Sequence, residues 1–221
     1  MIFLVFDGGH CMKIDIEIVT GFLGAGKTSF INSLLRESQV EGEKIIVFQL
    51  ESGKIQLCES NDKNYPVKCL RLKNIEDLKR DILNEISCYK PNRIIIEYNG
   101  TFYMDELIKI LKDKKYREFV RISTIFFVAD GKSLNEYINN IGNFIIPFIR
   151  SADMIIVNNT ECCNEKIIEE EVKRIKSMNP KAFILKVNNK YTLNSKLKEA
   201  RVLDNGYLKK LKVRMMNSKK I

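Results

Sequence analysis

The sequence has no long apolar run. None of its 221 residues lies in a hydrophobic stretch that approaches the roughly 20 residues needed to span a bilayer. The apolar opening Met1–Phe6 ends at Asp7 and follows no basic segment, so it is too short for the core of a signal peptide. We therefore expect a cytoplasmic protein with no membrane partner. Residues 1–12 are treated as an N-terminal extension, because translation could start at Met1 or at Met12.

Histidine and closely spaced cysteine pairs are also scarce. His10 is the single histidine, and the six cysteines form no C-x-x-C pair. Without an export signal, six cysteines indicate reduced thiols rather than a disulfide framework. The adjacent Cys162 and Cys163 favour neither a bridge between them nor a standard zinc site.

Most of the chain lacks an excess of one charge. The formal net charge is +9, and ten basic and two acidic residues between Lys190 and Ile221 account for +8 of it. A positive field over the whole surface, which would steer nucleic acid, is therefore not expected, and nucleic acid is disfavoured as a partner. We predict that residues 190–221 form a solvated basic tail, with docking to an acidic partner as the alternative.

Apolar segments of strand length alternate with segments of helical periodicity. Nearly unbroken Ile/Val strands, each followed by a helix, indicate a parallel sheet that is buried on both faces. The sequence therefore predicts an α/β fold of three layers, with a mostly parallel β-sheet covered by helices on both faces. The expected strands are 13–19, 44–50, 93–97, 123–128, 152–157 and 182–187, and the expected helices include 27–37, 75–86, 104–114 and 133–149.

One predicted strand is unusual for such a sheet. Asp15 and Glu17 alternate with isoleucines in the strand 13–19, although the first strand of a parallel sheet is usually central. Either one face of the sheet is polar there, or the strand is less buried than its place in the sequence implies.

A phosphate-binding loop follows this strand. Residues 21–28, GFLGAGKT, match G-x-x-x-x-G-K-[ST] between a predicted strand and a predicted helix. Glycines let successive backbone N–H groups point at a phosphate, and the helix N-terminus adds positive potential. Lys27 is expected to reach the β- and γ-phosphates, and the Thr28 hydroxyl to take a Mg²⁺ position. The predicted nucleotide-binding residues of this loop are Gly21, Gly24, Ala25, Gly26, Lys27, Thr28 and Ser29.

The segment 20–28 resembles the phosphate loop of the CobW-like P-loop GTPases, relatives of HypB and UreG, and similar segments follow in the same order up to residue 187. The resemblance implies a P-loop NTPase fold and a GTPase domain over residues 13–189. The segment ending in Glu51 and Gly53 is similar to the family's switch, which implies that Glu51 is a Mg²⁺ ligand. The segment 93–100 is similar to a Walker B strand ending in E-x-x-G. It implies that Glu97 lies near Mg²⁺ and the attacking water and that Gly100 senses the γ-phosphate.

The segment 158–161, NNTE, resembles the family's guanine-reading N-K-x-D. The resemblance implies that Asn158 and Glu161 read the base, because a carboxylate accepts the N1–H and N2–H of guanine. Asn159 replaces the lysine, and Glu161 is one methylene longer than aspartate. GTP and GDP are therefore favoured over ATP. The alternative is that Asn158 and Glu161 only cap a loop.

The family's C-x-C-C metal motif is reduced here. Alignment on the next helix places residues 66–69 at that point, which leaves Cys69 as a candidate ligand for Zn or Co. The alternatives are a small packed thiol and a site gathered from Glu51, Cys58 and Cys69. Because about 34 residues follow Val187, the chain resembles a truncated form without the family's C-terminal domain, one that needs a second polypeptide.

These features favour a Mg²⁺-dependent nucleoside triphosphatase that binds and hydrolyses GTP and acts as a metallochaperone or activator for a protein client. Lys27 and Glu97 are the predicted catalytic residues, with Thr28, Glu51 and Glu97 on Mg²⁺. The alternative is a nucleotide-binding interaction module that has lost hydrolysis and metal transfer and regulates a partner protein. A third alternative is a kinase for a small molecule, but the sequence contains no arginine-rich lid segment that would support it.

Overall fold

The computed structural model describes residues 12–50, 57, 59–100, 103–200, 203 and 205–218. Within this part, seven strands form one sheet in the order β3-β2-β4-β1-β5-β6-β7, and every paired neighbour is parallel. The α/β fold predicted from the sequence is confirmed. The strands are β1 (Ile14–Gly21), β2 (Ile45–Gln49), β3 (Val67–Arg71), β4 (Arg93–Asn99), β5 (Val120–Asp130), β6 (Met154–Asn158) and β7 (Phe183–Lys186).

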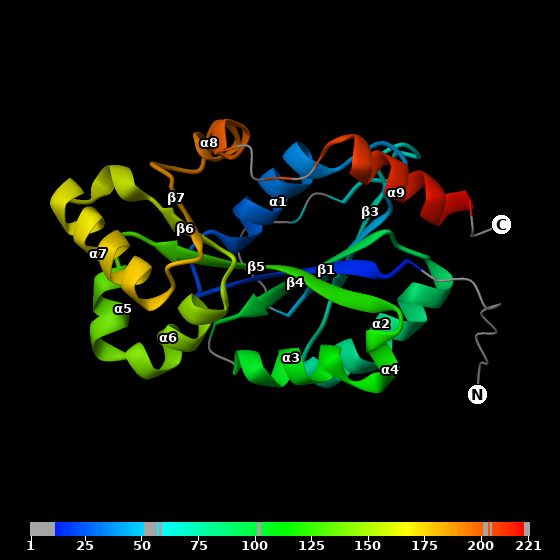
Figure 1. Ribbon diagram of the computed structural model, residues 1–221, viewed down its shortest axis with the longest axis horizontal. Coiled ribbons are helices and arrows are strands. Elements are labelled where there is room, and N and C mark those ends of the chain that lie inside the picture. The colour runs from blue at the N-terminus through cyan, green and yellow to red at the C-terminus, as the bar shows by residue number, and fades with distance from the viewer. Residues whose placement is uncertain are drawn as a thin grey trace.

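Helices cover both faces of the sheet (Figure 1). One hydrophobic cluster joins the sheet to the helices that follow β3, β4, β5 and β6, and a second joins the opposite face to α1 and α8. None of the described helices is long and apolar enough to cross a membrane. The helices are α1 (Lys27–Ser38), α2 (Ile75–Cys88), α3 (Met104–Lys112), α4 (Lys114–Arg117), α5 (Leu134–Asn140), α6 (Gly142–Ser151), the 3-10 helix η1 (Thr160–Cys162), α7 (Glu165–Met178), α8 (Leu193–Ala200) and α9 (Tyr207–Ser218).

The structure differs from the expected elements in one strand and one helix. The strand β3 was not predicted, because its partly exposed residues at the sheet edge lack an apolar run. The helix expected over 133–149 is divided into α5 and α6 at Ile141, whose backbone (φ −130°, ψ 33°) leaves the helical region.

The C-terminal segment is folded onto the domain, so the prediction of a solvated basic tail is wrong for its described part. Leu193 and Leu197 of α8 pack in the core beside α1, and Val213 of α9 is buried. The ammonium group of Lys209 lies 3.1 Å from the Glu43 carboxylate, and Lys212 pairs with Asp15. The basic residues of α9 thus neutralise acidic side chains of the sheet end. Figure 1 shows α9 beside the start of β1.

The unusual carboxylates of β1 are explained by the same packing. Ile14, Ile16 and Ile18 face one core cluster, while Asp15 and Glu17 point to the opposite face. Asp15 pairs with Arg121 and Lys212, and Glu17 pairs with Arg93. The first of the two alternatives therefore holds: β1 is central, and one face of the sheet is polar near its start.

Candidate nucleotide-binding site

The phosphate loop leaves the end of β1 and enters α1, as its strand–loop–helix pattern predicts. Gly21 has φ +145°, and a Cβ at this position would lie 2.0 Å from the Val128 carbonyl oxygen of β5. Gly26 has φ +99°, and its Cβ would lie 2.5 Å from the Asn158 side-chain nitrogen. Both φ values lie in a region that L side chains rarely adopt. At Gly21 the added atom would also overlap the backbone of β5, so glycine is required there on both grounds.

Lys27 is folded back over the loop. Its ammonium group donates hydrogen bonds to the carbonyl oxygens of Gly21, at 2.8 Å, and Phe22, at 2.9 Å. The side chain is buried, so these carbonyl groups solvate a charge that water does not reach. The lysine is thereby held against the loop. A phosphate bound there would accept hydrogen bonds from the same ammonium group.

A hydrogen-bonded chain connects α1, β4 and β2. The Thr28 hydroxyl donates to one Glu97 carboxylate oxygen at 2.7 Å, and the Gln49 amide donates to the other at 2.6 Å. Glu97 is only 2% exposed, and it lies opposite Gln49 in the parallel register of β2 and β4. The structure therefore brings together Thr28 and Glu97, two of the residues predicted from the sequence.

Gln49 was missed by sequence reasoning. The available signal was a lone polar residue at the carboxyl end of the otherwise apolar strand Ile45–Gln49. Ligands of parallel sheets bind at this end, so a buried polar residue there is informative. Gly100 joins the same edge, since its N–H donates to the Gly21 carbonyl oxygen at 3.0 Å.

Asn158 connects the end of β6 to the phosphate loop. Its side-chain nitrogen donates to the Ala25 carbonyl oxygen at 3.3 Å. Its side-chain oxygen is buried and has no hydrogen-bond partner within the described part of the chain. An unpaired buried acceptor at a phosphate loop is a place where a ligand donor would be stabilised.

Glu161 lies farther out, in η1, and is exposed. Its carboxylate accepts a hydrogen bond from the Asn189 side chain at 2.5 Å. The backbone of this loop is fixed to the end of β7, because the Thr160 N–H donates to the Val187 carbonyl oxygen at 3.1 Å. Asn189 was not predicted, and no local motif marks it; its position follows only from the adjacency of β6 and β7.

The other predicted ligands are not gathered at this site. Cys69 lies in β3, opposite Val47, at the edge of the sheet. Within the described ranges, no group of three His, Cys, Asp or Glu side chains is placed to hold a metal ion. Glu51 and Cys58 lie outside the described residues. The described residues thus do not provide a transition-metal site, whereas the Thr28 and Glu97 oxygens have the chemistry that Mg²⁺ prefers.

Burial changes one titration beside Glu97. The ring of Tyr98 is fully buried and its hydroxyl donates to the Tyr103 carbonyl oxygen at 3.1 Å. Burial, with a smaller contribution from the Glu106 charge, raises the pKa of Tyr98 to about 12. The hydroxyl of Tyr98 therefore keeps its proton, and its hydrogen bond to Tyr103, to higher pH than an exposed tyrosine would.

Two curated proteins are similar to parts of this chain. The zinc chaperone YjiA of Escherichia coli K12 is 26% identical over 191 residues, which are 76% of this chain and 56% of YjiA. The circadian clock oscillator protein KaiC of Rippkaea orientalis is 29% identical over 127 residues, which are 51% of this chain and 23% of KaiC. The chain thus spans about half the length of YjiA and about a quarter of KaiC.

Solved structures share the fold. The crystal structure of Zn(II)-bound YjiA GTPase from E. coli has a TM-score of 0.61 at 22% identity, over 78% of this chain and 57% of that chain. HypB from Helicobacter pylori in complex with nickel has a TM-score of 0.51 at 10% identity, over 93% and 88% of the two chains. Residues 15–186 match the nucleotide-binding domain of CobW/HypB/UreG, and the chain therefore belongs to this family.

Proposed function

We propose that the chain binds GTP with Mg²⁺ and hydrolyses it slowly, as a switch that activates a protein client. The observation that carries this proposal is the buried contact between Thr28 and Glu97, which joins the phosphate loop to the carboxyl end of β4. A hydroxyl and a carboxylate in contact beside a phosphate loop are the oxygen ligands expected for Mg²⁺ and for a positioned water. The cytoplasmic location expected from the sequence belongs to the same proposal.

Lys27 would bind the β- and γ-phosphates. In the structure, its ammonium group is held by the Gly21 and Phe22 carbonyl oxygens, and phosphate oxygens would take over these hydrogen bonds. Because the side chain is buried, its charge acts at low dielectric and stabilises the negative charge that develops on the phosphates. The loop N–H groups would add to this stabilisation.

Thr28, Glu97 and, from outside the described residues, Glu51 would hold Mg²⁺, which neutralises phosphate charge when it is bound. Glu97 would also orient the attacking water. Its two oxygens accept hydrogen bonds from Thr28 and Gln49, so the carboxylate has a fixed orientation before a ligand arrives. Gly100, which contacts Gly21 through its N–H, would report the presence of the γ-phosphate to the loop after β4.

Asn158 and Glu161 would read guanine. Support comes from the Asn158 contact with Ala25, which places this side chain against the phosphate loop. A thermal-shift comparison of GTP, GDP and ATP with Mg²⁺ tests base selection. A nucleotide at 100 times its Kd adds about 2.7 kcal/mol to the free energy of unfolding. Stabilisation by GTP and GDP alone is expected, and an equal effect of ATP would contradict guanine reading.

Turnover is tested by multiple-turnover phosphate release. Glu97→Ala should lower the rate at least about 100-fold, because a positioned carboxylate is lost from the reacting centre. Glu85→Ala is the matched control, since Glu85 of α2 is also a buried glutamate but pairs with Lys68 of β3. Equal rates in the two variants would contradict the role of Glu97.

The metal cargo is proposed from the relatives. YjiA is named a zinc chaperone, and the HypB structure contains nickel. We extend this to delivery of Zn or Co by this chain, with Cys69 as a ligand beside groups outside the described residues or on the client. Loss of Zn²⁺ or Co²⁺ binding in Cys69→Ser, with binding retained in Cys88→Ser, would support this step; no metal binding by the wild-type chain would remove it.

A second candidate function is a nucleotide-binding module that regulates a partner without hydrolysis. It is favoured by the engagement of both Glu97 oxygens by Thr28 and Gln49, which would compete with a water molecule. Nucleotide binding without phosphate release in the wild-type chain would establish this alternative over the first.

A further inference from the structure

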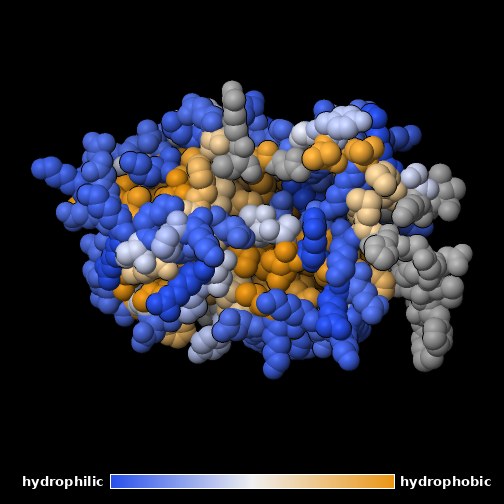
Figure 2. All heavy atoms as spheres, viewed as in Figure 1, coloured by the Kyte–Doolittle hydropathy of each residue, from blue (hydrophilic) through white to orange (hydrophobic). Residues whose placement is uncertain are grey.

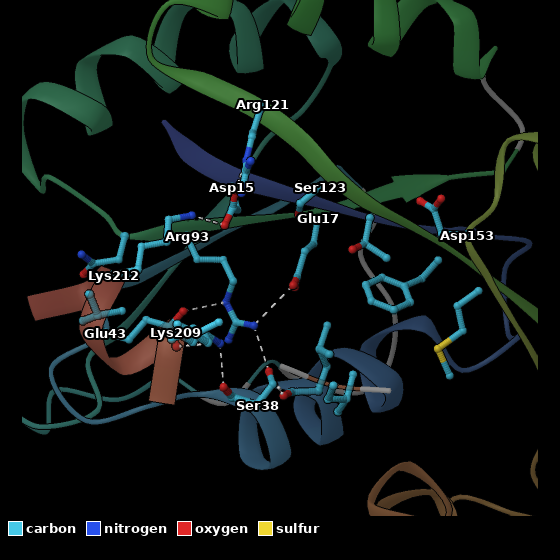
Figure 3. Close-up of a pocket in the computed structure, with 18 of the residues that line it drawn as sticks. Asp15, Glu17, Ser38, Glu43, Arg93, Arg121, Ser123, Asp153, Lys209 and Lys212 are labelled. Atoms are coloured by element: carbon cyan, nitrogen blue, oxygen red, sulfur yellow. Dashed lines mark hydrogen bonds and ion pairs between the residues drawn. The ribbon is translucent and has the colours of Figure 1, made fainter. Parts of the chain in front are cut away.

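A second pocket lies at the opposite end of the sheet from the phosphate loop. It has a volume of about 470 Å³ and is lined by residues from the starts of β1, β4, β5, β6 and β7, the end of α1, and α9. Figure 3 shows Arg93 directed toward Glu17, Glu43 and Ser38 in this pocket. The elements that carry the nucleotide site at one end, β1, β4 and α1, thus carry this pocket at the other.

Arg93 is the central residue of the pocket. It is 4% exposed, and its Nη1 atom donates to the Ser38 hydroxyl at 2.9 Å and to one Glu17 oxygen at 3.4 Å. Its Nε atom lies 3.2 Å from the Glu43 carboxylate. The second terminal nitrogen, Nη2, is buried and has no acceptor among the described residues. An arginine commonly pairs with a carboxylate through two hydrogen bonds of less than about 3 Å. The pair of Arg93 and Glu17 has only one longer contact.

Glu17, the partner of Arg93, has a buried oxygen atom without a hydrogen-bond donor among the described residues. Its Oε1 atom takes the 3.4 Å contact from Arg93, while its Oε2 atom is buried and without a donor in the described part of the chain. Arg93 Nε is also without a hydrogen bond to any described residue and has only its ion-pair contact with Glu43. Among the described residues, the pocket therefore contains one guanidinium nitrogen, Nη2, with neither a hydrogen bond nor an ion pair, and one carboxylate oxygen, Glu17 Oε2, without a donor. Leaving two such groups unpaired costs about 1–3 kcal/mol each, which a ligand with one acceptor and one donor would recover.

The charges and the walls restrict the ligand further. Four acidic and four basic side chains line the pocket, so neither a free anion nor a free cation gains net attraction. A carboxylate would meet Glu17, and an ammonium group would meet Arg93, at short range. The lining also contains apolar side chains, which include Leu34, Phe126 and Met154.

We propose that this pocket binds a neutral amphipathic ligand, in which a primary carboxamide accepts from Arg93 and donates to Glu17 while an apolar group packs on Phe126 and Met154. The site is independent of the proposed GTPase function, because no residue of the phosphate loop lines it.

Three probes of one shape test the proposal on the full chain: benzamide, benzoate and benzamidine, which are neutral, anionic and cationic. Binding is followed by the methyl NMR signals of ¹³C-labelled methionines. Met154 and Met216 line the pocket and should shift saturably with benzamide, while the buried Met104 and the exposed Met215, neither of which lines the pocket, serve as internal controls. Benzoate and benzamidine should bind at least about tenfold more weakly.

Glu17→Gln reverses the charge preference. The substitution keeps an acceptor but removes the negative charge, so benzoate should gain at least about tenfold relative to benzamide. Equal binding of the three probes to the wild-type chain, or no shift of Met154 and Met216 with benzamide, would overturn the proposal. The second result would indicate that bound water, rather than a ligand, satisfies the unpaired atoms of Arg93 and Glu17. If Glu17→Gln does not fold, the three probes on the wild-type chain decide.

Discussion

At the scale of single residues, two of the three glycines of the phosphate loop, Gly21 and Gly24, offer a matched comparison. Gly21→Ala should lower the free energy of unfolding by about 3 kcal/mol or more, because its Cβ would overlap the Val128 carbonyl oxygen at 2.0 Å. Gly24→Ala should cost only about 1 kcal/mol, since it has φ +81° but nothing within 4 Å of the added atom. Urea denaturation measures both. Equal losses would show that φ, rather than the contact with β5, sets the requirement.

Gln49 is tested at the same scale. Gln49→Leu removes the donor of a 2.6 Å hydrogen bond to a buried carboxylate, Glu97, which should cost about 1–3 kcal/mol of stability. The same substitution in a Glu97→Gln background should cost less, because a neutral amide tolerates burial better than a carboxylate. Chemical denaturation of the four chains gives the coupling free energy, and an additive result would contradict the contact.

Residues of the nucleotide site could be predicted from sequence where the information is local. The spacing of residues 21–28 locates Lys27 and Thr28 without any knowledge of the sheet. Gln49 and Asn189 could not be found in this way, because each gains its role from a strand neighbour far away in sequence. Gln49 meets Glu97 only through the β2–β4 register, and Asn189 meets Glu161 only because β6 and β7 are adjacent.

At the scale of elements, the docking of α9 depends on the ion pairs of Asp15. Burial alone would raise the pKa of the Asp15 carboxyl, but the hydrogen bonds and charges of Arg121 and Lys212 outweigh it and hold the pKa below its usual value. A depressed carboxyl pKa stabilises the fold above the pKa of the unfolded chain, roughly 3.9, and this contribution is lost as the pH falls through the folded-state pKa.

Asp15→Asn should therefore lower the free energy of unfolding by about 1 kcal/mol at pH 7 and have a much smaller effect near pH 3. Urea midpoints at the two pH values give the comparison. Asp62→Asn is the control, because Asp62 lies in an exposed turn and has no basic partner within the described residues. A loss that is as large at pH 3 as at pH 7 would show that Asp15 acts through packing and not through its charge.

The errors at this scale have a common physical origin. The strand β3 and the helices α8 and α9 are short or strongly charged, so their local patterns are weak. Tertiary contacts decide them: Leu193 and Leu197 pack beside α1, and Lys209 and Lys212 find acidic partners on the domain. Apolar side chains remain exposed along α9, including Leu208 at 76%, and Figure 2 shows an orange group at its start.

At the scale of the whole molecule, the sheet has a candidate site at each of its two ends. The carboxyl ends of its strands carry the nucleotide site, and the opposite ends carry the pocket around Arg93. The first end was predictable, because parallel sheets bind ligands there and a motif marks the loop. The second was not, because the lining of the pocket comes from seven elements (β1, α1, β4, β5, β6, β7 and α9), and α9 was expected to be solvated. The only sign of this pocket in the sequence was the presence of two carboxylates, Asp15 and Glu17, in an otherwise apolar strand.

This separation of the two ends predicts a hydrogen-exchange pattern. GTP with Mg²⁺ should slow amide exchange in residues 21–28 and in the loop that follows Asn158, because the ligand engages the loop N–H groups and orders both segments. Amides of α9 should change little, since its contacts to Glu43 and Asp15 lie at the far ends of the strands. Lys27→Ala should remove the protection at the same nucleotide concentration. Protection of α9 comparable to that of the phosphate loop would instead show that the two ends are energetically coupled through β1, β4 and α1.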